Sequence, residues 1–447
     1  MKENRLTTEP IPKLIRQIAV PASVGFFFNT MYNVIDTYYG GMLSTEALAA
    51  MTLSFPIFFI ILAMGSGISN GATALITNSL GAKEKEKAEK YGCQAVSFAF
   101  IFSIFLSILG LLAAPSLFRI LGANSEYLKL TLSYTNVIFY GTAFFMLTNV
   151  LNGILIAEGD TKTFRNLIIL GFLLNLLLDP WFMFGWLGFP KMGLAGVALA
   201  TVLINVIEFL LLTKKVITEK DFSHIHLKNL IPDKKYFKAI IKQGFPASLN
   251  MMSMAIGIFV VTYFISSFGK NSVAGYGIAT RIEQIAILPA IGLNMAVLAL
   301  SGQNNGAKQF DRLKEIYKKS LQYGMVLIFV GMIFISIFSK QLMGFFTKDI
   351  DVINIGTTYL RIAVLFYLTY TILNISTSIL QGIKKPLYGL YLSTYRFLIM
   401  PAITFFVLTK IFNLQIISMW FALFFINWSA AIFTFFYTKN KLHKLGN

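Results

Sequence analysis

Residues 14–40 read LIRQIAVPASVGFFFNTMYNVIDTYYG, an apolar run that contains only one arginine and one aspartate. A helix that crosses a bilayer needs about 20 mainly apolar residues, so this run is long enough to do so. Eleven more such runs follow along the chain. The twelve predicted spans lie at approximately 14–40, 47–77, 89–113, 129–156, 164–186, 193–213, 239–267, 272–301, 316–338, 355–380, 387–410 and 415–437. The sequence therefore predicts an all-α membrane protein.

Composition supports a membrane protein over a soluble one. Of the 447 residues 56% are hydrophobic and 13% are charged, whereas soluble domains carry about 25% charged residues. The net charge of +18 follows from lysines and arginines that concentrate in alternate loops. This asymmetry is typical of cytoplasmic loops and favours anionic lipid headgroups as partners. We expect no nucleic-acid partner, cytoplasmic N- and C-termini, and a location in the cytoplasmic membrane.

The two halves of the chain are related. Residues 20–83 align without a gap to residues 245–308, at a constant offset of 225, with fourteen identities. A second register, with an offset of 223, matches Gly159 to Gly382. Because each half has an even number of spans, both halves point the same way and the repeat is parallel. Transporters built from such repeats bind substrate near the midplane of the membrane.

The longest polar stretch, residues 214–238, separates the halves. We expect it to be a cytoplasmic linker. The predicted division is a six-helix lobe at residues 1–213, the linker, and a second six-helix lobe at residues 239–447.

Motifs of enzyme chemistry are missing from the sequence. It contains no G-x-x-x-x-G-K-[ST], H-E-x-x-H or G-x-S-x-G, and its histidines fall in the linker or the C-terminal tail. Cys93 is the only cysteine, which excludes a Cys-based metal site. We expect a protein that is not an enzyme and has no cofactor.

Polar side chains recur at helical spacing in three predicted spans of the first half. Their spacings of four and seven residues place each set on one helix face. The sets are Asn29, Asn33 and Asp36 in the first span, Asn175 and Asp179 in the fifth, and Thr201, Asn205 and Glu208 in the sixth. Ionisable groups inside a membrane usually mark ion or substrate paths. We interpret the three stripes as lining a shared polar cavity.

The internal repeat provides a comparison for these residues. At an offset of 225 the first-span stripe becomes Met254, Ile258 and Val261. At an offset of 223 Asn175 and Asp179 become Leu398 and Ala402, and the sixth-span set falls on apolar positions at either offset. A requirement of the shared fold would apply to both halves, so the stripes indicate function. The alternative is structural, since Asn33 could simply bond to Asp36.

The residue types allow two kinds of coupling ion. Carboxylate, amide and hydroxyl oxygens from Asp36, Asn175, Asp179 and Thr201 suit a hard cation such as Na⁺, and the same carboxylates could instead carry a proton. Pro21 removes a backbone hydrogen bond from the first span, which would make it a hinge.

In the eighth span Glu283 follows Arg281 by two residues. This arrangement is either a local ion pair or part of a substrate path in the second half.

Several motifs together resemble the multidrug and toxic compound extrusion (MATE) family, and the resemblance covers nearly the whole chain. They are DTYYG (36–40), STEALAAMTLSFP (44–56), NSLGAK (78–83), LNGILIAEGDTK (151–162), NLLLDPWFMFG (175–185), GLAGVALAT (193–201) and ALSGQNNGAK (299–308). The resemblance implies two six-helix lobes and alternating-access antiport of cationic aromatic compounds. It is greatest to the DinF-like prokaryotic branch.

In that branch the resemblance implies an ion site in the N-terminal lobe, formed by Asp36, Asn175, Asp179 and Thr201, with Pro21 as the bend proline. Coupling through the second lobe, as in the NorM branch, is not expected, because residues 246–267 and 355–380 contain no Asp or Glu. The predicted function is export of amphipathic compounds by a monomer in exchange for Na⁺ or H⁺. The alternative is a lipid-linked flippase of the same superfamily, for which Arg281 and Arg396 supply few intramembrane cations.

Overall fold

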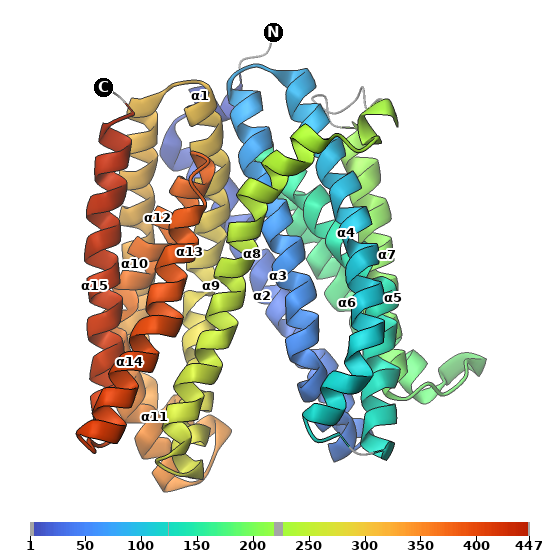
Figure 1. The fold of residues 1–447 in the computed structure, drawn as a ribbon, viewed down its shortest axis with the longest axis vertical. Coiled ribbons are helices and arrows are strands. Elements are labelled where there is room, and N and C mark those ends of the chain that lie inside the picture. Colours follow the sequence, from blue (N-terminus) through green and yellow to red (C-terminus); the bar gives the residue numbers. More distant parts are fainter. Residues whose placement is uncertain (1–3, 124, 219–226, 446–447) are drawn as a thin grey trace. The chain divides into compact units, whose positions relative to one another are not determined.

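The computed structural model describes residues 4–123, 125–218 and 227–445, and this part of the chain is helical without strands (Figure 1). Twelve of its helical segments are long and apolar enough to cross a membrane, which confirms the predicted number of spans. The elements are α1 (Arg5–Thr8), α2 (Ile11–Leu43), α3 (Thr45–Gly81), α4 (Lys85–Ile120), α5 (Ser125–Ala157), α6 (Lys162–Phe184), η1 (Trp186–Gly188), α7 (Leu194–Thr218), η2 (Leu227–Leu230), α8 (Lys234–Ser266), α9 (Lys270–Gly306), α10 (Phe310–Phe346), α11 (Ile350–Ala363), η3 (Val364–Phe366), α12 (Tyr367–Gly382), α13 (Leu387–Ser393), η4 (Thr394–Ile399), α14 (Met400–Phe406), η5 (Val407–Ile411) and α15 (Ile417–His443).

The chain forms two compact units. Unit 1 consists of Met1–Ser23 and Leu249–Asn447, and unit 2 consists of Val24–Ser248. The divisions fall inside α2 and α8. The predicted lobe boundaries at 213 and 239 stay a prediction, and residues 219–226 of the predicted linker lie outside the described residues.

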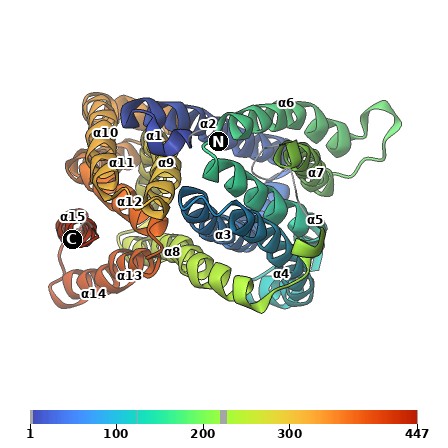
Figure 2. The same cartoon turned by 90° about the horizontal axis from the view of Figure 1, so that it is seen from above.

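Each unit has a central helix surrounded by others. In unit 2, α5 packs against α3, α4 and α7, and α6 packs on α7 (Figure 2). In unit 1, α9 packs against α10, α11 and α12, while α15 packs on α12. Of the most apolar window of α5, 67% is buried, compared with 17% for α4. The central helix α5 is thus largely buried, whereas the peripheral helix α4 presents apolar side chains outward.

The repeat is visible in helix bounds and in close contacts. Helix α9 begins and ends 225 residues after α3. A Cβ added to Gly67 of α3 would lie 1.9 Å from the Ser248 hydroxyl oxygen, and one added to Gly292 of α9 would lie 2.2 Å from that of Ser23. These glycines are 225 residues apart, and so are the serines. Small residues at both contacts let the backbones approach closely, which explains why the Pro-Ala-Ser segments occur in both halves.

The second predicted register, at an offset of 223, is wrong at its central match. Gly159 has a positive φ of 82°, and the residue with the corresponding backbone conformation in the second half is Lys384, with a φ of 62°. Helices α5 and α12 end at residues 157 and 382, again 225 apart. The offset of 225 therefore extends beyond the first two spans, and Gly382 instead precedes the left-handed position.

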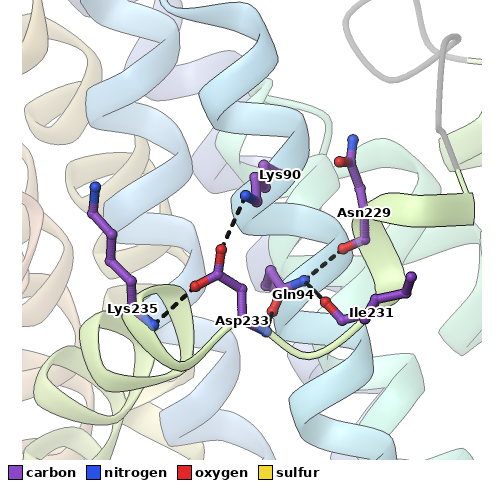
Figure 3. A network of polar contacts seen from close by, with 6 residues as sticks. All are labelled: Lys90, Gln94, Asn229, Ile231, Asp233 and Lys235. Carbon is purple, nitrogen blue, oxygen red and sulfur yellow. Dashed lines mark hydrogen bonds and ion pairs between the residues drawn. The ribbon is translucent and has the colours of Figure 1, made fainter.

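Gln94, a fully buried residue of α4, holds the chain segment that leads into α8 (Figure 3). Its amide nitrogen donates to the carbonyl oxygens of Asn229 and Ile231, at 2.6 and 2.7 Å, and its amide oxygen accepts from the backbone N–H of Asp233 at 2.8 Å. One side chain thus satisfies three backbone groups that precede the first turn of α8.

Asp233 completes this contact at the start of α8. Its carboxylate lies 3.0 Å from the Lys90 amino group and accepts from the backbone N–H of Lys235 at 2.9 Å (Figure 3). Both interactions favour the ionised form, and the Lys90 hydrogen bond contributes most to a pKa of Asp233 below its usual range.

We expect Gln94→Leu to lower the free energy of unfolding by about 1–3 kcal/mol, because backbone groups that Gln94 satisfies lose their partner. Thermal unfolding of the purified protein in detergent measures this loss. Asn229→Ala is the matched control, since it leaves the Asn229 carbonyl in place and removes only a side-chain bond to Glu89. Equal unfolding temperatures for the two variants would contradict the anchoring role of Gln94.

Candidate functional site

Three helices of unit 2 bring together the four residues predicted to bind an ion. Asp36 of α2 is 8% exposed, Asn175 and Asp179 of α6 are fully buried, and Thr201 of α7 is 6% exposed. The Asn175 amide nitrogen donates to Asp36 Oδ1 at 2.8 Å. The carboxyl groups of Asp36 and Asp179 lie next to each other.

Local structure explains how these side chains converge. The spacing of Asn175 and Asp179 places both on one face of α6, and α6 ends at Gly185, whose φ of 75° is left-handed. The Tyr39 hydroxyl of α2 donates to the Leu176 carbonyl of α6 at 3.2 Å, which fixes the two helices to each other one turn from Asp36. The Thr201 hydroxyl donates to the Val197 carbonyl of its own helix. The lone pairs of the hydroxyl oxygen can therefore accept a hydrogen bond or coordinate a cation.

Three buried oxygen atoms at this site have no hydrogen-bond donor among the described residues. They are both carboxylate oxygens of Asp179 and the amide oxygen of Asn175. Buried polar atoms nearly always have a partner in folded proteins, and the exceptions often have a functional role. The site thus combines two adjacent carboxyl groups with acceptor oxygens that no described residue satisfies.

Tyr32 belongs to the same cluster and was not predicted. Its buried hydroxyl lies beside Thr201 and close to both carboxyl groups, without a well-formed hydrogen bond. Tyr32 precedes Asp36 by one helical turn, so its spacing was a usable signal. Tyrosine is common in membrane helices as an aromatic residue. The search for polar side chains at helical spacing therefore did not include Tyr32.

The other predicted path residues lie outside this cluster. Asn29 and Asn33 are exposed, and the Asn33 amide donates to the Asn29 carbonyl of its own helix. Asn205 likewise donates to the carbonyl of Thr201. The structural alternative paired Asn33 with Asp36, but Asn175 is the residue that donates to Asp36.

Glu208 is buried on α7, next to α6. A Cβ added to Gly171 would lie 2.8 Å from Glu208 Oε1, so the carboxylate occupies the space that this glycine leaves. Among the described residues the carboxylate makes no ion pair.

Glu283 lies in unit 1, away from Arg281. Glu283 is 5% exposed and accepts a hydrogen bond from the Tyr359 hydroxyl at 2.8 Å, whereas Arg281 is exposed. The local ion pair that was one interpretation of the sequence is therefore not formed. Pro21 is buried inside α2, in the part assigned to unit 1.

The atoms of this cluster that could coordinate a cation are oxygen atoms. No group of three or more His, Cys, Asp or Glu that could hold a metal ion is found in residues 4–123, 125–218 and 227–445. Two carboxylates with an amide and a hydroxyl oxygen match the preferences of hard cations, and adjacent carboxyl groups can also exchange a proton.

The described residues form twelve helical segments that can cross a membrane, with a six-plus-six repeat and a polar centre among the spans. This is the architecture of membrane transporters. The family model MatE matches residues 21–181 and 246–407. The chain belongs to this family, the multidrug and toxic compound extrusion family. It is a multi-pass membrane protein and a transporter, not an enzyme.

Several curated prokaryotic proteins are similar to the chain. The probable multidrug resistance protein YoeA of Bacillus subtilis (strain 168) is 27% identical over 85% of this chain and 83% of its own length. The multidrug export protein MepA of Staphylococcus aureus (strain MSSA476) is 26% identical, with coverages of 86% and 84%. The FAD transporter of Shewanella oneidensis (strain MR-1) is 26% identical, with coverages of 88% and 87%.

Solved structures agree with this assignment. A MOP superfamily transporter from Pyrococcus furiosus Vc1 matches with a TM-score of 0.93 and 28% identity, covering 100% of this chain and 99% of that one. An outward-facing multidrug resistance MATE transporter of the MOP superfamily matches with a TM-score of 0.92, the same identity and the same coverages. The predicted family and the two-lobe repeat fold are confirmed.

We expect Asn175→Ala to lower the free energy of unfolding by about 1–3 kcal/mol, because buried Asp36 loses its donor. In an Asp36→Asn background the loss should be smaller, since the carboxylate that needs the donor is gone. Thermal unfolding of the single and double variants in detergent gives the coupling energy. Asn205→Ala is the control, because the Asn205 amide donates to the Thr201 carbonyl of its own helix. Equal losses in both backgrounds would show that Asn175 does not act through Asp36.

Proposed function

We propose that this chain is a secondary antiporter that exports amphipathic, mainly cationic compounds in exchange for Na⁺ or H⁺. The proposal rests on family membership and on relatives that are named as multidrug resistance and export proteins. It places the chain as a monomer in the cytoplasmic membrane, with both termini in the cytoplasm. Membrane lipids are its constant partners.

The observation that carries the proposal is the set of unsatisfied oxygens beside Asp36. Keeping ionisable groups inside a membrane is costly, and two neighbouring carboxylates also repel each other. A cation or a proton that binds between Asp36 and Asp179 removes that repulsion. Asn175 and Thr201 supply further oxygens for a cation such as Na⁺.

An antiporter exchanges ion for substrate if the binding of each one disfavours the binding of the other. Such coupling is reciprocal. In this proposal, ion capture neutralises the Asp36 and Asp179 pair and weakens attraction for a cationic substrate. Release of the ion restores the negative charge and the attraction. The exposed amides Asn29 and Asn33 would serve the substrate path.

Three further residues have proposed roles. Asn205 and Glu208 extend the polar path along α7. Pro21 is the proposed hinge of α2, since a proline leaves the carbonyl four residues earlier without its backbone donor. A helix weakened at that point can change its bend when the charge on its own aspartate changes.

We expect proteoliposomes that contain the protein to transport the cation ethidium in response to an imposed Na⁺ or pH gradient. Asp36→Asn should reduce the gradient-driven flux at least tenfold, because the side chain can no longer alternate between charged and neutral forms. Fluorescence of ethidium in vesicles that contain nucleic acid measures the flux, with each gradient applied separately.

The matched control is Asp311→Asn, which neutralises an exposed aspartate at the start of α10. This variant should transport as the unchanged protein does. Gradient-driven flux that persists in Asp36→Asn would rule out the proposed ion site, and flux that responds to neither gradient would rule out antiport.

A further inference from the structure

A second buried polar centre lies in unit 1, where five helical elements meet. It is formed by Glu283 of α9, Tyr359 of α11, Tyr370 of α12, Arg396 of η4 and Asn427 of α15. This set is referred to here as the Arg396 centre. It contains one potential negative and one positive charge, and none of its residues belongs to the proposed ion site.

Arg396 is held in place by its neighbours. Its Nε donates to the side-chain oxygen of Asn427, and its guanidinium carbon lies 4.7 Å from the ring centre of Tyr370 and 4.6 Å from that of Phe397. The Tyr370 hydroxyl lies near both Arg396 and Glu283. No ion pair joins Glu283 directly to Arg396 among those formed by the described residues.

Two positions that carry polar side chains in the Arg396 centre are apolar in unit 2. At the offset of 225 that the helix bounds confirm, Glu283 corresponds to Phe58 and Tyr370 to Phe145. These two phenylalanines pack edge to face, with ring centres 5.4 Å apart. The fold that both halves share therefore does not require a charged group at these positions.

The helix that carries Arg396 is locally irregular. Residues 394–399 form a π-helical segment, whereas the equivalent residues 169–174 lie within the regular helix α6. Single π-helical turns are rare and occur frequently at functional sites. The equivalent of Arg396 in α6 is Gly171, so both the charge and the irregular backbone are specific to unit 1.

The residues of the centre differ in burial. Glu283 and Tyr359 are buried, but Arg396 and Tyr370 are only half-buried. An arginine has five N–H donors, and Asn427 takes the one on Nε. The two terminal guanidinium nitrogens of Arg396 carry the remaining four N–H donors.

We propose that the Arg396 centre binds the anionic group, a carboxylate or phosphate, of a planar aromatic substrate. The guanidinium provides a fork of donors that matches such groups. Tyr370 and Phe397 supply aromatic faces beside it. Glu283 balances the charge of Arg396 when no anion is bound. This inference rests on the proposed function, because it adds a second class of substrate to the exported compounds.

The competing explanation is purely structural, with the charged groups holding five helical elements together. The two explanations predict different signs for one substitution. If the centre binds anions, Glu283→Gln removes a negative charge near the guanidinium and should strengthen anion binding. If the centre only joins helices, Glu283→Gln and Arg396→Gln should both destabilise the fold. Both should then also weaken the binding of every ligand.

The test measures binding to the full-length protein in neutral detergent without any gradient. The probe is nalidixic acid, a planar aromatic carboxylate, and its ethyl ester is the uncharged control ligand. We expect Arg396→Gln to weaken binding of the acid at least tenfold and to leave binding of the ester unchanged. Glu283→Gln should tighten binding of the acid several-fold. Isothermal titration calorimetry measures both effects.

Two further variants keep the result interpretable. Arg361→Gln removes an exposed arginine of α11 and should bind the acid as the unchanged protein does. Arg396→Lys keeps the charge without the fork of donors, and should give intermediate affinity even if Arg396→Gln does not fold. The proposal fails if Glu283→Gln and Arg396→Gln both weaken binding of the acid and of the ester to the same extent. It also fails if Arg396→Lys binds the acid as the unchanged protein does.

Two additional arms separate the other possibilities. If phosphatidylglycerol displaces nalidixic acid from the unchanged protein at equal concentration, the centre serves a lipid headgroup and the proposal is overturned. If Arg396→Gln weakens and Glu283→Gln tightens binding of the acid while gradient-driven flux is absent, the proposed antiport is overturned and the Arg396 centre is supported.

Discussion

The hydrocarbon interior of a bilayer offers no water to polar groups, and the rest of this structure depends on that constraint. Backbone groups must be satisfied inside each segment, so the spans are helices. Helices that gain nothing from the hydrophobic effect against each other must associate through close packing, which explains the contacts at Gly67 and Gly292. Each polar side chain that lies in the membrane interior needs a hydrogen-bond partner or has a functional role.

The local pattern of the sequence was sufficient to predict the spans and the repeat, because both depend on the order of neighbouring residues. It was not sufficient where a contact joins distant segments. The sequence suggested Asn33 as the partner of Asp36, since the two are three residues apart. In the structure the donor is Asn175, from another helix, and Asn33 bonds to its own helix. Spacing indicates a shared face, but it does not identify the residue opposite.

Two other differences have the same origin. Matching Gly159 to Gly382 relied on residue identity, whereas the left-handed backbone position is held by a glycine in one half and by Lys384 in the other. One interpretation of the sequence paired Glu283 with Arg281, its neighbour in sequence, but Glu283 contacts Tyr359, 76 residues away. A helix turns by about 100° per residue, so residues two apart point away from each other. Helix geometry therefore disfavours an ion pair between Arg281 and Glu283.

The two halves share a backbone but keep their polar centres at different positions. Asp36 corresponds to Val261, and Glu283 corresponds to Phe58. Each apolar counterpart packs as an ordinary membrane core residue would, which shows that the fold is stable without the charge at that position. A charge that the fold does not need has no structural reason to persist against its insertion cost. The asymmetry of the repeat therefore separates the groups that hold the helices together from the groups that bind ions or substrates.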